Sequence, residues 1–115
     1  MTAEPSFTRH GRRMPTDRLR AALNALAEGH AQIVSHLEKP WASITFAGTR
    51  HTLSLVFEGH DAVAAGEDFI AILPEHEFTI PGQLVADASI AEVEHHLLPV
   101  PRLSVQCEIL LLEES

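Results

Sequence analysis

Histidine and glutamate side chains carry most of the chemistry that this chain could perform. The chain contains eight histidines, and its densest group of potential metal ligands is Glu92, Glu94, His95 and His96. In an extended strand, Glu94 and His96 lie on the same side, about 7 Å apart at their Cα atoms. From that separation both can reach one divalent metal ion, with Glu92 or His76 as the third ligand. Glu92, Glu94 and His96 are therefore the candidate metal ligands.

This metal hypothesis has a simple alternative. No His-Glu-x-x-His or Cys-x-x-Cys spacing accompanies the cluster. Histidines that close a strand before a proline-rich turn can also titrate freely in solvent. We therefore expect no cofactor and keep a divalent metal as the alternative.

Acid–base chemistry points to a second place, the connection formed by residues 75–83. Long connections often carry function, and this one contains the titratable residues His76 and Glu77. These two are the candidate catalytic residues of a His/Glu acid–base enzyme. The alternative is a structural loop that Phe78 and Ile80 anchor to the core. Cys107 lies in an apolar alternation, where burial makes a thiol inert.

Two helices are predicted from the spacing of apolar residues. One apolar stripe steps by three and four residues and predicts a helix from about residue 15 to 37, ended by Pro40. A second stripe predicts a helix that Asp61 caps and Pro74 ends. The first stripe consists of Leu19, Leu23, Leu26, His30, Ile33 and Leu37.

Alternating apolar and polar residues predict four strands, two after each helix. Gly48-Thr49 is the expected turn of the first hairpin, and Pro81-Gly82 fits a type II turn before the third strand. The alternation slips between Ile90 and Val93, which indicates a bulge. The predicted strands are residues 41–47, 50–58, 84–97 and a last strand from residue 102 onward.

The order αββαββ favours an α+β fold with a four-stranded antiparallel sheet and both helices on one face. A right-handed crossover through the second helix places the strands in the order third, fourth, second, first. This order resembles a circular permutation of the ferredoxin-like plait. The second and fourth strands are then central, as their clean apolar alternation requires. Short similar runs in the two halves also suggest an internal repeat.

Length, charge and cysteine content restrict the class of protein. Its 115 residues suit one domain, residues 15–115, preceded by a disordered basic tail, residues 1–14. The first twenty residues hold five basic and two acidic side chains, a net charge of +3. Because the whole chain has a net charge of −8, residues 21–115 carry −11. An acidic body repels phosphate backbones, so we expect no nucleic-acid partner. The apolar runs are too short to span a membrane, and one cysteine without a signal segment favours the cytoplasm.

These features together predict a small binding or accessory module, homodimeric, with a polar acidic pocket for a small molecule. The open face of the sheet mixes polar and apolar residues, which suits self-association or the wall of such a pocket. The candidate ligand-binding residues are Trp41, His51 and Arg102. The alternatives are the metal-assisted or His/Glu enzyme and a purely structural protein-interaction domain.

Overall fold

The computed structural model describes residues 15–114 and confirms the αββαββ order of an α+β fold. A short 3₁₀ helix, η2 (Leu73–Glu75), follows the second helix. The predicted tail, residues 1–14, lies outside the described residues, and the domain boundary after it stays a prediction. The main elements are α1 (Pro15–Leu26), β1 (Ala31–Ala42), β2 (Ala47–Glu58), α2 (His60–Ile72), β3 (Gln83–His96) and β4 (Arg102–Glu113).

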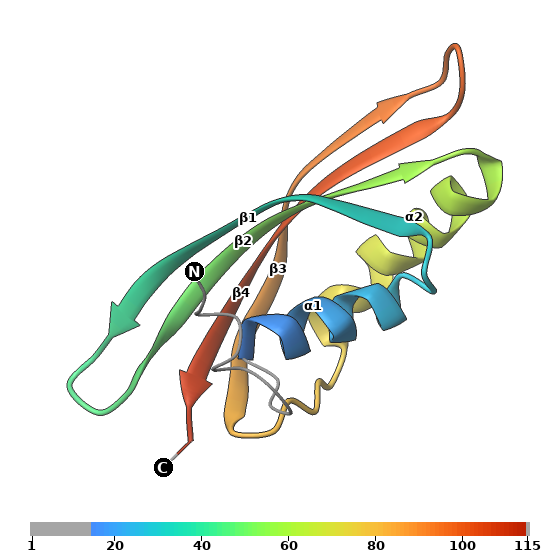
Figure 1. Ribbon diagram of the computed structural model, residues 1–115. Coiled ribbons are helices and arrows are strands. Elements are labelled where there is room, and N and C mark those ends of the chain that lie inside the picture. Colours follow the sequence, from blue (N-terminus) through green and yellow to red (C-terminus); the bar gives the residue numbers. More distant parts are fainter. Residues whose placement is uncertain (1–14, 115) are drawn as a thin grey trace, which may run out of the picture.

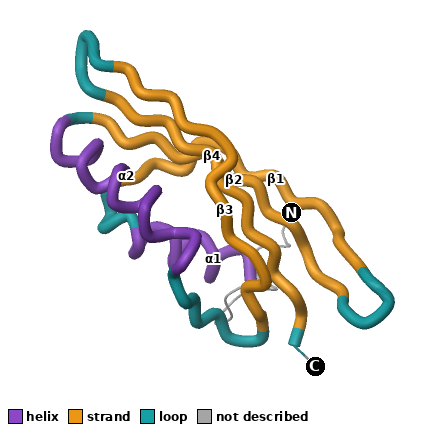
Figure 2. The backbone as a smooth tube through the Cα atoms, turned by 180° about the vertical axis from the view of Figure 1, so that it is seen from behind, coloured by secondary structure: helices purple, strands orange, loops and turns teal. Residues whose placement is uncertain are grey.

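The four strands form one antiparallel sheet in the order β1-β2-β4-β3, with β2 and β4 central, as expected. Both helices lie on one face of this long, twisted sheet (Figures 1 and 2). The β1–β2 and β3–β4 hairpins reach out at opposite ends of the molecule (Figure 1). The likeness to a permuted plait stays a prediction. Neither described helix has the length and apolar character needed to cross a membrane.

The prediction that the first helix continues to residue 37 was wrong. α1 ends at Leu26, and Glu28 and Gly29 then adopt positive φ angles of 58° and 75°. The amide of Gly29 donates to the carbonyl of Asn24 at 2.9 Å. This hydrogen bond spans five residues and is the 6→1 bond of a Schellman motif, which ends a helix. Residues 31–42 therefore form a strand. Pro40 does not end a helix but lies in the edge strand β1, where a missing amide donor is tolerated.

The first hairpin turns at residues 43–46, and the predicted turn at Gly48-Thr49 was wrong. Ser43 stabilises the turn, because its Oγ accepts hydrogen bonds from the backbone amides of Thr45 and Phe46 at 3.3 and 3.0 Å. Gly48 and Thr49 belong to β2, where they pair with both neighbouring strands. A serine that satisfies two amide donors was a stronger turn signal than the glycine.

The second half of the chain follows its predicted course more closely. Asp61 lies in the first turn of α2, but Gly59 occupies the N-cap position and no side chain caps the helix. The turn at Pro81-Gly82 is present, with Gly82 at φ 79° and a 3.0 Å bond from the Gln83 amide to the Ile80 carbonyl. The predicted bulge also occurs, as a register shift between Ile90 and Glu92.

The core lies between the helices and the inner face of β2 and β4. Phe57 and Phe69 are both fully buried, and their ring centroids are 5.8 Å apart. Gly66 of α2 lets the helix approach, since a Cβ there would lie 2.7 Å from a Leu103 methyl carbon and 2.8 Å from the Phe57 ring. The other fully buried aliphatic side chains in this core include Leu19, Leu23, Leu53, Leu55, Leu73 and Ile109.

Cys107 belongs to this core and should be chemically inert in the native protein. It is fully buried, and burial, with a smaller contribution from Glu108, raises its pKa from 9.0 to about 12. At pH 8 we expect Ellman's reagent to react about a thousandfold more slowly with the native protein than with protein unfolded in guanidinium, because only the thiolate attacks. Rapid reaction of the native thiol would contradict the described packing of β4.

Candidate functional site

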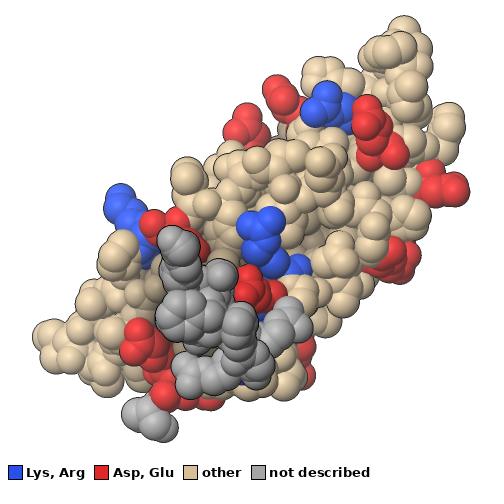
Figure 3. Space-filling model, in the orientation of Figure 1, with Lys and Arg blue, Asp and Glu red and all other residues tan. Residues whose placement is uncertain are grey.

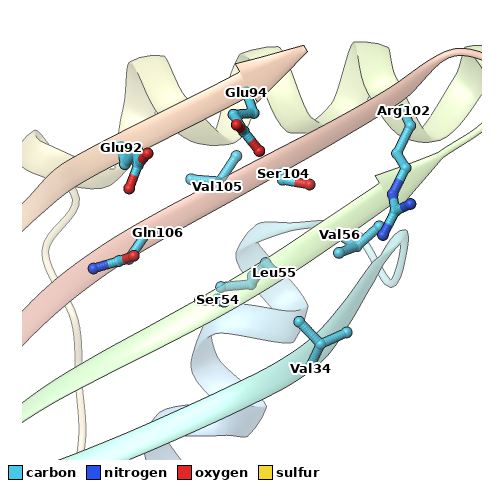
Figure 4. Close-up of a pocket in the computed structure, with 10 residues that line it drawn as sticks. All are labelled: Val34, Ser54, Leu55, Val56, Glu92, Glu94, Arg102, Ser104, Val105 and Gln106. Atoms are coloured by element: carbon cyan, nitrogen blue, oxygen red, sulfur yellow. The ribbon is translucent and has the colours of Figure 1, made fainter. Parts of the chain in front are cut away.

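The open face of the sheet carries a shallow hollow of about 250 Å³, to which all four strands contribute (Figure 4). Glu92 and Glu94 line it from β3, and Arg102 lines it from β4. Val34 and Val56 supply apolar surface from β1 and β2. The remaining lining residues are Ser54, Leu55, Ser104, Val105 and Gln106.

Most of the side chains that line this hollow are polar or charged. Its ten lining residues include two serines and two glutamates but no histidine, cysteine or lysine, so neither serine hydroxyl has an imidazole or an amine beside it in the hollow to act as its base. It offers two carboxylates, one guanidinium, two hydroxyls and one side-chain amide on an open surface. Such a surface can receive a polar ligand or a polar segment of another protein chain.

A second group of polar residues lies on the opposite, helix-covered face. His51 of β2 is 2% exposed, the only polar residue in the buried part of the described chain. Its Nδ1 is 2.9 Å from Nε2 of His36 in β1, and Arg20 of α1 places Nη1 3.2 Å from the other ring nitrogen of His36. Glu38 pairs with His51 across the strands and accepts a 3.1 Å bond from Thr16 Oγ1.

The hydrogen bonds determine which ring nitrogens carry protons. A guanidinium can only donate, so Nδ1 of His36 must accept from Arg20. The proton of neutral His36 is then on Nε2 and is donated to Nδ1 of His51. Nε2 of neutral His51 carries its own proton. Arg20, His36 and His51 thus form one directed chain of hydrogen bonds.

Both histidines favour the neutral state. Burial is the main cause that lowers the pKa of His36, the charge of Arg20 lowers it further, and Glu38 opposes the shift. Burial also lowers the pKa of His51, with a further contribution from His36 against the opposing effect of Glu38. Neutral imidazoles retain the lone pairs that a metal ion requires.

The predicted ligand-binding residues do not come together. Trp41 pairs with Gly48 near the β1–β2 turn, whereas Arg102 pairs with Glu58 at the other end of β2. His51 lies on the helix-covered face, opposite the hollow that Arg102 lines. The three residues therefore cannot line one pocket within a single copy of the chain.

The other predicted site residues lie in three places, the hollow and two further depressions. Glu92 and Glu94 share the hollow, while His96 lines an adjoining depression with Glu58 and Leu98. Arg102 lines both the hollow and this depression. The role of Glu92, Glu94 and His96 as metal ligands stays a prediction.

His76 and Glu77 are exposed and line a third depression, in which the His76 ring packs edge-on against Phe78 with centroids 4.6 Å apart. Their catalytic role also stays a prediction.

Sequence reasoning missed the contribution of His36 and Glu38. It placed residue 36 in a helix, whereas β1 contains a register shift between Ile33 and Ser35. This bulge turns His36 and Glu38, instead of Ser35 and Leu37, toward the helices. The sequence signal that could have revealed His36 and Glu38 was Gly29, because a glycine just after a helix often marks where the helix ends.

Comparisons with known proteins complete the description of the chain. No protein-family model and no curated protein matches it. Among solved structures, it is similar to a chain of the structure described as "Virion of native gene transfer agent (GTA) particle", with a TM-score of 0.55 and 14% sequence identity. The match covers 85% of this chain and 91% of that chain. At this identity the likeness concerns the fold alone.

Proposed function

We propose that this protein is a non-catalytic assembly module that associates with further copies of itself through its two hairpin ends. The observation that carries this proposal is that both ends expose large apolar side chains and carry no charge. We call residues 43–46 the first end and residues 97–101 the second end. The exposed apolar residues are Ile44 and Phe46 in the first end and Leu97, Leu98 and Val100 in the second.

These side chains are unusually exposed for their size. Ile44 is fully exposed and Leu98 is 83% exposed. Hairpin turns normally place glycine, asparagine, aspartate or serine in such positions, because these residues suit the backbone and remain hydrated. Burying one large aliphatic side chain at an interface is worth about 1.5–3 kcal/mol. Exposed apolar ends of this kind are typical of sites at which a protein contacts another protein surface.

The charge distribution favours a second copy as the occupant. The chain carries −8 overall, so two copies repel each other over most of their surfaces. Neither end contains an acidic or basic residue. The outermost parts of both ends are also free of charged side chains in the space-filling view (Figure 3). Acidic copies can therefore approach each other most closely at these ends.

The likeness to a virion chain supports the same proposal. A chain of similar fold occurs within a particle, which is an assembly of chains. The small-molecule pocket has weaker support, because the hollow on the open face is shallow. A second copy that covered this face would enclose it. A homodimer is the smallest assembly that the proposal allows.

Sedimentation velocity over a range of protein concentrations tests self-association directly. We expect Leu98→Ser and Ile44→Ser each to weaken association about 10- to 100-fold, in line with the apolar surface lost. Ile72→Ser is the matched control, because Ile72 is 45% exposed at the end of α2 and lies outside both ends. A monomer at all concentrations, or variants that associate like the wild type, would overturn the proposal.

Salt separates apolar contact from ionic contact. Raising the ionic strength from about 0.01 M to 0.15 M shortens the Debye length from ~30 Å to ~8 Å. Screening weakens the repulsion between acidic copies, so we expect association to strengthen. Weaker association at the higher ionic strength would point to an ionic interface elsewhere on the surface.

A further inference from the structure

We propose that His36, Glu38 and His51 form a binding site for one divalent transition-metal ion, with zinc as the natural occupant. One potential donor atom from each of the three residues lies within 4.8 Å of the others. Two imidazole nitrogens and one carboxylate oxygen are a donor set that zinc accepts. The site is independent of the hairpin ends and of self-association.

Separate elements hold the three ligands in place. His36 and Glu38 occupy neighbouring inward positions of β1, and Glu38 pairs directly with His51 of β2. The hydrogen-bonded pairing of the edge strand β1 with the central strand β2 therefore sets the spacing of the ligands. His51 is 2% exposed, whereas Glu38 is exposed, so the site is closed on one side and open on the other. A metal ion can reach it without unfolding of the core.

The distances need only a small adjustment. Nε2 of His36 and Nδ1 of His51 are 2.9 Å apart. Tetrahedral zinc with bonds of 2.0–2.1 Å to nitrogen requires a separation of about 3.3 Å between two ligand atoms. The exposed edge of β1 can supply a movement of a few tenths of an ångström. Thr16 already donates to Oε2 of Glu38, which orients the carboxylate and leaves Oε1 for the metal.

Metal binding changes the tautomer of His36 without changing its charge. In the metal-free protein the proton on Nε2 of His36 lies between the two rings, where the metal must bind. That proton has to leave Nε2 while another occupies Nδ1, so the ring stays neutral and no net proton is released. Nδ1 then becomes a donor and can no longer accept from Arg20.

Arg20 is consequently the residue that opposes the metal. Its guanidinium must move away from the His36 ring, and its positive charge lies beside a second cation. Replacing Arg20 with glutamine removes the charge and offers an oxygen that can accept from Nδ1–H. Changes in such supporting contacts typically alter metal affinity about 10- to 100-fold. We expect Arg20→Gln to tighten binding by about 10-fold.

Cobalt and zinc titrations of the full chain, purified without a histidine tag and treated with chelator, test the site. We expect one Co²⁺ per chain with the strong visible absorption of a low-coordinate site, displaced by one Zn²⁺. At a free zinc concentration about a hundredfold above Kd, the melting temperature should rise by roughly 10 °C. The increase arises because the metal binds the folded protein and not the unfolded chain, and its measurement needs no enzymatic readout.

Three variants make the assignment specific. Glu38→Gln removes an exposed ligand without disturbing the core and should weaken Co²⁺ binding at least 10-fold, while Arg20→Gln should tighten it. His95→Gln is the matched control, since this exposed histidine lies in β3 outside the site. Absence of binding by the wild type would overturn the proposal. Binding that survives Glu38→Gln, or that is lost in His95→Gln, would overturn it too, because the metal would then lie elsewhere.

Discussion

Replacing Phe57 with alanine is expected to lower the free energy of unfolding by about 3–5 kcal/mol, the usual cost of truncating a buried phenylalanine. Phe57 is fully buried at the centre of the core, where it contacts Phe69 and the backbone of α2 at Gly66. Its loss leaves a cavity between the sheet and α2 that these two elements cannot fully fill by moving together. Urea denaturation followed by far-ultraviolet circular dichroism measures the change.

Two further variants determine whether this packing is the cause. Val93→Ala removes a side chain that is 43% exposed and should cost less than about 1 kcal/mol. Gly66→Ala places a methyl group against the Phe57 ring and should cost about 1–3 kcal/mol in the wild type. The double variant Phe57→Ala/Gly66→Ala should lose less than the sum of the two single changes. Additive losses would show that Phe57 and Gly66 are not in contact.

Gly48→Ala is expected to destabilise the protein by about 3 kcal/mol, at the upper end of the range for overpacking. A Cβ at Gly48 would lie 2.0 Å from the carbonyl oxygen of Leu111 in β4. The obstacle is backbone and not a flexible side chain, so β2 and β4 must separate at this end of the sheet. Because β2 and β4 are the central strands, the disturbance reaches the whole sheet.

Chemical denaturation together with amide hydrogen exchange checks this second expectation. In Gly48→Ala, amides of β4 near Leu112 should exchange faster than in the wild type, because Leu112 is the pairing partner of Gly48. Ala47→Ser changes the exposed neighbouring residue and should shift stability by less than about 0.5 kcal/mol. A similarly small effect of Gly48→Ala would mean that β2 and β4 do not pair closely here.

Much of the fold could be predicted from alternation and from turn residues. The last strand, with Leu103, Val105 and Cys107 on one face, forms as expected because a half-buried strand requires that period. The turn at Pro81-Gly82 and the bulge after Ile90 also appear in their predicted places. Each of these features depends on residues close together in the chain, and for that reason the sequence could predict them.

The errors lie in the first helix and hairpin. The stripe from Leu19 to Leu37 has helical spacing, but Glu28 and Gly29 interrupt it with positive φ angles. The strand β1 was not recognised in the sequence, because its bulge interrupts the two-residue alternation between Ile33 and His36. Apolar spacing alone cannot distinguish a continuous helix from a helix followed by a bulged strand.

By itself, the sequence determined the α+β class, the αββαββ order, the central position of the second and fourth strands, and the burial of Cys107. The spacing of apolar residues indicates helices and strands, and crossover connections have a preferred hand, so both can be inferred from one sequence. Only the tertiary structure decided that His36, Glu38 and His51 meet, and that Trp41, His51 and Arg102 do not. Such meetings depend on strand register and on one bulge, and a shift of one residue moves every side chain to the other face of the sheet.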